Sequence, residues 1–168
     1  MSKYKIFYSF DYDTDVFRVQ QIRQIGVLEG NEPVTPNKWE SVKKEGDSAI
    51  QKWIDEGIAN CECFICLIGE HTYTSKWVDY EIRKAWALKK PIIGIYIDDL
   101  RDPRLHSKPP HYGKSLRGRN PFGQITIGNV ALSSVISTYI PSASDAYNDI
   151  ANKIESWIVL SIKNRRTL

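Results

Sequence analysis

The chain has 168 residues, of which 42% are hydrophobic and 26% are charged, and its formal net charge at pH 7 is +3. This length is typical of one domain with a sizeable core, and so small a net charge argues against a protein that binds nucleic acid over its whole surface. No apolar run is long enough to span a membrane, and the first residues lead into a strand-like segment rather than a secretory signal. We therefore expect a single cytoplasmic domain over residues 1–168 that contacts neither membrane nor nucleic acid.

Strand-like and helix-like segments alternate along the chain. Short runs of β-branched and aromatic residues predict strands, and apolar residues at helical spacing predict amphipathic helices. The predicted strands are residues 4–9, 27–29, 63–68, 91–97, 124–127 and 135–140. The predicted helices are residues 14–25, 47–58 with Asp47 as cap, 75–89 and 144–162, and the predicted loops include residues 10–13 and 30–45.

This alternation, with continuously apolar middle strands, predicts an α/β fold in which helices cover both faces of a central parallel sheet. The usual small sheet of this kind is flavodoxin-like, with strand order 2-1-3-4-5, and it binds ligands beyond the carboxyl ends of strands 1 and 3. That order places residues 9–12 beside the loop at 69–74 and the helix that begins at Ser75. We expect these segments to converge on one site.

One predicted helix start carries the most informative residues. Ser75 is a good N-cap residue, and Trp77 and Glu81 are four residues apart, so they lie on one helix face. An indole beside a carboxylate suits a flat, positively charged ring. The alternatives are that Trp77 closes the edge of the core and that Glu81 is a solvated carboxylate paired with Arg83 or Lys84.

Residues 98–123 are predicted to form a basic loop insertion. Between Arg101 and Arg119 there are six lysines and arginines and one acid, Asp102, together with several prolines and glycines. The insertion is either solvated and partly mobile or a patch for phosphates or an acidic partner. Residues 163–168 are expected to be a frayed tail.

The three cysteines lie in or beside one apolar strand. On a strand that includes Cys61, Cys63 and Cys66, the first two share one face and the third points to the other. An extended strand cannot wrap these thiols around one metal, even with His71 close by in the sequence. We therefore expect reduced, buried cysteines and no metal site.

Common nucleotide-binding motifs are missing from the sequence. Neither a G-x-G-x-x-G fingerprint nor a Walker A motif is present, which argues against a Rossmann dehydrogenase and a P-loop NTPase. The third predicted strand is followed by Gly69 and Glu70 rather than by a phosphate-accepting Asp, so phosphoryl transfer is not expected.

Two motifs resemble a known family. Residues 5–15 (KIFYSFDYDTD), with Arg18 and residues 20–23 (QQIR), resemble the opening of the TIR-like domains of bacterial Thoeris antiphage systems, the ThsB proteins. Residues 75–82 (SKWVDYEI) resemble the W-x-x-x-E helix start of TIR domains generally. The resemblance covers residues 4–98 by motif.

The resemblance implies an enzyme that cleaves NAD between nicotinamide and ribose and closes ADP-ribose into a cyclic isomer. NAD would be the substrate, with no further cofactor, and the product would activate a partner effector after phage infection. Glu81 would be the catalytic carboxylate that stabilises the developing oxocarbenium charge. The residues expected to line the NAD site are Ser9, Phe10, Asp11, Tyr12, Thr74, Ser75 and Trp77.

Several alternatives remain open on the sequence alone. Asp11 would contact NAD or cap the first helix, and Ser75 would contact a phosphate, act as a plain N-cap, or do both. For the whole domain, the alternatives to an enzyme that makes a cyclic product are a plain NAD hydrolase and a non-enzymatic interaction module. A phage-derived trigger and self-assembly are further implied partners, although residues 30–45 lack a recognisable TIR interaction loop and the insertion at 98–123 has no counterpart in the family.

Overall fold

A five-stranded parallel sheet forms the centre of the computed structural model, which describes residues 3–30, 41–105, 109 and 111–165. Its strands are β1 (Tyr4–Ser9), β2 (Leu28–Gly30), β3 (Cys63–Ile68), β4 (Ile92–Tyr96) and β7 (Ser137–Tyr139). Their order is β2-β1-β3-β4-β7, and every neighbouring pair is parallel. The predicted order 2-1-3-4-5 is confirmed, with β7 as the fifth strand.

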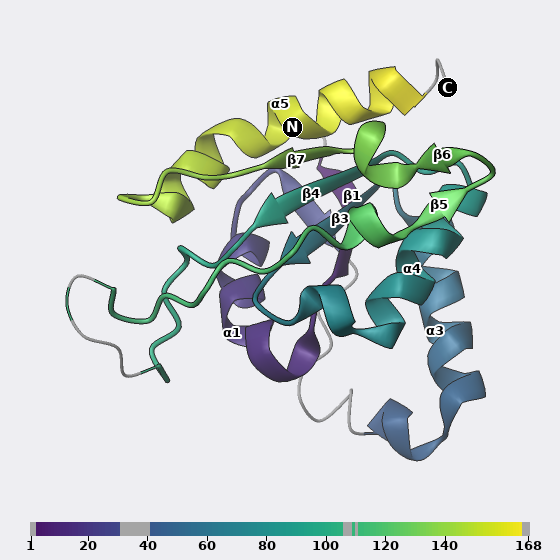
Figure 1. Ribbon diagram of the computed structural model, residues 1–168, viewed down its shortest axis with the longest axis horizontal. Coiled ribbons are helices and arrows are strands. Elements are labelled where there is room, and N and C mark those ends of the chain that lie inside the picture. The colour runs from purple at the N-terminus through teal and green to yellow at the C-terminus, as the bar shows by residue number, and fades with distance from the viewer. Residues whose placement is uncertain (1–2, 31–40, 106–108, 110, 166–168) are drawn as a thin grey trace.

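Helices cover both faces of this sheet (Figure 1). On one face, α1 (Tyr12–Arg23) and α5 (Ala146–Arg165) share a buried apolar cluster with the sheet. On the other face, α3 (Asp47–Asn60) and α4 (Lys76–Ala87) share a second cluster with it. Within the described ranges, no helix combines the length and apolar character needed to cross a membrane.

The central strand β3 is buried on both faces, as its uninterrupted apolar sequence predicts. Cys63 packs with the α1–α5 cluster, and Cys66 packs with the α3–α4 cluster. Cys61 joins the cluster of Cys66, so the expectation that Cys61 and Cys63 share one strand face is wrong, because β3 begins only at Cys63. All three cysteines are free and buried, and the described residues contain no His, Cys, Asp and Glu group placed to hold a metal.

Some predicted boundaries at the amino-terminal half are wrong. Helix α1 begins at Tyr12, inside the predicted loop, since the Asp15 backbone N–H already donates to the Asp11 carbonyl at 2.9 Å. Asp11 stands at the N-cap position, but its side chain makes no capping hydrogen bond. Residues 41–44 are helical although a loop was predicted there, while residues 31–40 of that loop lie outside the described part. Asp47 is the first residue of α3 rather than its cap, which is Gly46.

The carboxyl-terminal half also departs from the predicted elements. The predicted strand at 124–127 is instead β5 (Thr126–Ile127), which pairs antiparallel with β6 (Val130–Ala131) in a separate sheet. Helix α5 continues to Arg165, past the predicted start of the frayed tail. Arg165 holds this end because its guanidinium donates to the Trp86 carbonyl at 3.0 Å and lies 4.0 Å from the centre of the Trp86 ring.

Candidate active site

Helix α4 begins at the cap that the sequence predicts. The Ser75 Oγ accepts a hydrogen bond from the Val78 backbone N–H at 3.3 Å, which satisfies one of the free donors of the first turn. This cap starts the helix so that Trp77 and Glu81, one turn apart, both face the same cavity.

A cavity of about 130 Å³ lies where the carboxyl end of β1 meets α1, α3 and α4. Its lining residues are Tyr8, Phe10, Asp11, Tyr12, Asp13, Trp53, Ile54, Ser75, Trp77 and Glu81. Pockets that enclose a whole small-molecule ligand measure roughly 300–1,000 Å³. The cavity therefore suits one end of a larger ligand, with the remainder lying over the surface.

The structure brings most of the predicted site residues to this cavity. Those that line it are Phe10, Asp11, Tyr12, Ser75, Trp77 and Glu81. Ser9 is fully buried behind the wall, at the end of β1 and in register with Cys66. Thr74 ends the short helix η1 (Thr72–Thr74), where its hydroxyl donates to the His71 carbonyl at 3.0 Å, away from the lining.

Glu81 is a buried carboxyl at the cavity wall, with 7% of its surface exposed. Burial raises its pKa well above the usual range, and the neighbouring Ser9 hydroxyl opposes this by lowering the pKa. The Ser9 Oγ nevertheless makes no well-formed hydrogen bond with any described residue. The alternative of a solvated carboxylate is wrong, and Arg83 instead donates to Asp79 at 2.8 Å.

Two indoles from different helices line the cavity beside Glu81. Trp77 of α4 packs edge-on against Tyr80, with ring centroids 6.0 Å apart. Trp53 of α3 lies 6.4 Å from the Phe7 ring. Both indoles are half-buried, so each contacts the core and the cavity at once.

Sequence reasoning missed part of the lining. Trp53 and Ile54 occupy the apolar stripe of α3, which the helical spacing assigns to the core, and nothing in the sequence indicates that this stripe reaches a cavity. Asp13 joins the lining because α1 begins earlier than predicted. Tyr8 lies at the end of β1, where strand periodicity alone predicts a core side chain.

In the basic segment, residues 98–123, three cations pair with acids of the same segment: Arg104, Lys114 and Arg117. Arg117 contacts Asp98 at 3.2 Å and Asp99 at 3.3 Å, and Lys114 contacts Asp99 at 3.4 Å. Arg104 binds Asp102 at 2.7 Å, and this hydrogen bond lowers the pKa of Asp102. These pairs offset part of the positive charge of the segment.

A parallel α/β sheet, a cavity at the carboxyl end of β1 and a W-x-x-x-E helix start on α4 together define a TIR-like domain. A family model described as "Thoeris protein ThsB, TIR-like domain" matches residues 7–102. The chain belongs to this family, which confirms the prediction from the two motifs.

The chain is also similar to a protein of Bacillus cereus (strain MSX-D12) named "Putative cyclic ADP-D-ribose synthase ThsB1". The two are 34% identical over 124 residues, which is 70% of this chain. The matched region spans 60% of the length of that relative.

Proposed function

We propose that this chain is an NAD-consuming enzyme of Thoeris antiphage defence that releases nicotinamide and closes the remaining ADP-ribose into a cyclic signal. The observation that carries the proposal is Glu81, a buried carboxyl that faces a cavity walled by two indoles. Membership of the ThsB family supports it, as does the name of the Bacillus cereus relative, which specifies cyclic ADP-D-ribose synthesis.

The cavity lining suits the nicotinamide end of NAD. The nicotinamide ring is flat and positively charged, and aromatic faces such as those of Trp53 and Trp77 attract cations. Phe10 offers an apolar wall, and Asp11 offers a carboxylate for ribose hydroxyls. Ser75 lies at the N-terminus of α4, where free backbone N–H groups favour a phosphate, and we place the diphosphate there.

Ser9 and Thr74 take different roles in this arrangement. Ser9 is buried behind the cavity wall, where a hydroxyl close to Glu81 would lower the pKa of that carboxyl. Thr74 directly precedes Ser75, the cap of α4. In the proposed arrangement, Thr74 contacts the diphosphate of NAD from the outer side of this helix start.

Glu81 would act electrostatically on the reacting ribose. When the bond between nicotinamide N1 and ribose C1′ breaks, its electron pair goes to the nicotinamide nitrogen and positive charge develops on the ribose. A carboxylate already positioned beside that charge lowers the barrier. In the empty cavity burial favours the protonated carboxyl, and a bound cation favours the carboxylate, so substrate binding displaces the Glu81 proton to solvent.

The second step decides between a cyclic and a linear product. Attack on C1′ by a ribose hydroxyl of the same molecule, with loss of its proton, closes the ring. Attack by water instead gives linear ADP-ribose. Apolar side chains such as Phe10, Ile54 and the two indoles limit water in the cavity and favour closure.

Release of nicotinamide tests this proposal directly. NAD labelled in the nicotinamide ring is incubated with the wild type, with Glu81→Gln, and with Glu155→Gln, an exposed residue of α5, as the matched control. We expect release by the wild type and the control, and a loss of about 100-fold or more in Glu81→Gln. Equal release by all three proteins would contradict the proposal.

Partners follow from the same proposal. The product would act on a separate effector protein, and a component of the infecting phage would start synthesis. Self-assembly of the chain would be a further condition for activity. An unchanged defence by Glu81→Gln in infected cells would instead favour an interaction module.

A further inference from the structure

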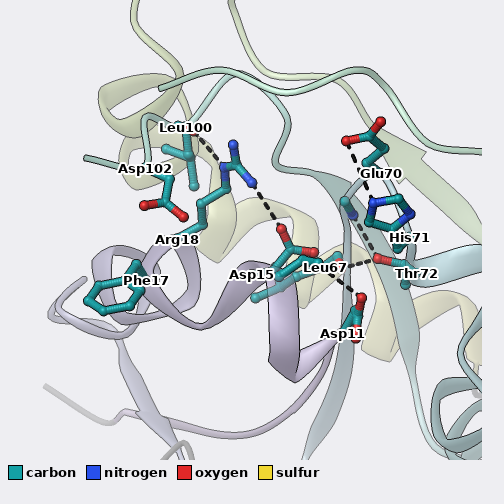
Figure 2. Close-up of polar contacts among 12 residues, drawn as sticks. Asp11, Asp15, Phe17, Arg18, Leu67, Glu70, His71, Thr72, Leu100 and Asp102 are labelled. Atoms are coloured by element: carbon teal, nitrogen blue, oxygen red, sulfur yellow. Dashed lines mark hydrogen bonds and ion pairs between the residues drawn. The ribbon is translucent and has the colours of Figure 1, made fainter. Parts of the chain in front are cut away.

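Arg18 is a buried arginine that connects α1 to the basic segment. Only 2% of its surface is exposed. Its Nε donates to the Leu100 carbonyl at 2.7 Å, and its Nη2 donates to the Gly113 carbonyl at 2.9 Å. Its Nη1 donates to the Asp15 Oδ1 at 3.0 Å, and Figure 2 shows the contacts of Arg18 with Asp15 and Leu100. One guanidinium therefore joins α1 to two points of the basic segment.

Asp15 fixes the other side of this connection. It is 1% exposed, and its carboxylate occupies the space in which a side chain on Gly69 would begin. Gly69 follows β3 directly, so this contact holds α1 against the carboxyl end of the sheet. Residues of α1, the end of β3 and the basic segment therefore meet at one buried point.

This point lies one helical turn from the cavity. The Asp15 backbone N–H donates to the Asp11 carbonyl at 2.9 Å, and the Thr14 hydroxyl donates to the Asp11 carboxylate at 2.8 Å. Asp11 and the two residues that follow it line the cavity. A helical turn is stiff, so a displacement at Arg18 moves these lining residues as well.

We propose that Arg18 is a positioning residue, which transmits the position of the basic segment to the cavity by holding the first turn of α1. The basic segment then has a role that its paired charges do not provide: its backbone at Leu100 and Gly113 sets the shape of the site. The effect on NAD rests on the proposed function, whereas the effect on the cavity does not.

Two substitutions break the connection from opposite sides. Arg18→Lys keeps a positive charge beside Asp15 but cannot donate to both carbonyls as the guanidinium does. Gly113→Ala acts from the basic segment, because Gly113 has a φ of +73° that other residues rarely adopt. Gly128→Ala is the matched control, since Gly128 has a φ of +62° in the β5–β6 turn, away from Arg18.

Fluorine NMR of the full chain labelled with 5-fluorotryptophan gives a readout that does not need activity. Trp53 and Trp77 report on the cavity. Trp157, which stacks on Tyr139 at 4.3 Å within the other cluster, is the internal control. Each resonance is assigned by replacing one tryptophan, and the Michaelis constant for NAD is measured on the same proteins.

We expect Arg18→Lys and Gly113→Ala to shift the Trp53 or Trp77 resonance and to raise KM for NAD about tenfold, with a smaller change in kcat. Gly128→Ala should leave the Trp53 and Trp77 resonances and KM as in the wild type, and the Trp157 resonance should not shift in any variant. If both variants only lower Tm and leave the cavity resonances and KM as in the wild type, Arg18 is structural and the proposal is wrong. Should Arg18→Lys fail to fold, Gly113→Ala decides, and shifted resonances in a protein that releases no nicotinamide would reject the proposed function alone.

Discussion

Trp77 and Glu81 lie one turn apart on α4, and both side chains line the same cavity. The indole adds an aromatic face beside a carboxyl that burial keeps largely from water. In the proposed function, the positively charged nicotinamide ring binds at this pairing and favours loss of the carboxyl proton.

The first prediction concerns the stability of Glu81→Gln. Because burial raises the pKa of Glu81, the folded state disfavours the carboxylate. The stability that the protonated Glu81 contributes is fully present below the ordinary carboxyl pKa and is lost as pH rises through the raised pKa. We expect Glu81→Gln to have a higher Tm than the wild type near neutral pH, by a few degrees, since about 1 kcal/mol shifts Tm by roughly 2–4 °C at this size.

The same comparison should converge in acid. Near pH 4 both Glu81 and the glutamine are neutral, so thermal unfolding of the two proteins should give similar Tm values. Glu155→Gln again serves as the control and should follow the wild type throughout. A glutamine variant that is less stable at neutral pH would indicate that the Glu81 carboxylate is structural.

A second prediction separates two roles of Trp77. Trp77→Leu keeps apolar bulk but removes the aromatic face, and loss of a cation–π contact should raise KM for NAD roughly tenfold. Trp157→Leu removes an indole from the opposite face of the sheet and should change Tm without changing KM. If KM is unaffected in Trp77→Leu, the indole only closes the edge of the core.

Ser75 gives a third prediction, which distinguishes helix capping from phosphate binding. Ser75→Ala loses the bond to Val78 and should lower the free energy of unfolding by about 1 kcal/mol. Ser75→Asp keeps a capping oxygen, so it should retain wild-type stability, yet its charge should repel a phosphate and raise KM for NAD. Wild-type KM in a stable Ser75→Asp protein would mean that Ser75 is a cap alone.

Asp15 gives a fourth prediction, on pH. Burial raises its pKa to about 6, although Arg18 beside it favours the carboxylate and Asp11 opposes it. The stability that the protonated Asp15 contributes to the fold is fully present below about pH 4 and is lost as pH rises through about 6. Asp15→Asn does not titrate, so its free energy of unfolding relative to the wild type should increase by on the order of 3 kcal/mol from pH 4 to pH 7. Parallel pH curves from urea unfolding would contradict this.

Features set by local sequence could be predicted. The strands β3 and β4 follow from continuous apolar runs, β1 follows from a run rich in aromatic and β-branched residues, and the start of α4 follows from Ser75 as cap. The strand order then brings the residues after β1 to the start of α4, and the cavity lies there. These conclusions need only propensities, periodicity and the topology rule for parallel sheets.

Features set by tertiary contacts could not be predicted. Trp53 reaches the cavity because of how α3 packs beside α4, which its helical spacing does not reveal. Lys114 and Arg117 of the basic segment pair with Asp98 and Asp99, which precede the charged run, so the composition of that run alone overstates the free positive charge. The sequence marks Arg18 only as part of a motif. Its contacts with the Leu100 and Gly113 carbonyls could not be predicted, because both residues lie more than eighty positions away in the sequence.

Extracts of infected cells show whether Glu81 is needed to make a cyclic nucleotide from NAD. Cells that express the wild type or Glu81→Gln are challenged with phage, and small molecules are separated by chromatography and identified by mass spectrometry. We expect a product with the mass of cyclic ADP-ribose, one water lighter than linear ADP-ribose, in wild-type cells only. The same product in Glu81→Gln cells would contradict this expectation, and linear ADP-ribose with falling NAD would identify a plain hydrolase instead.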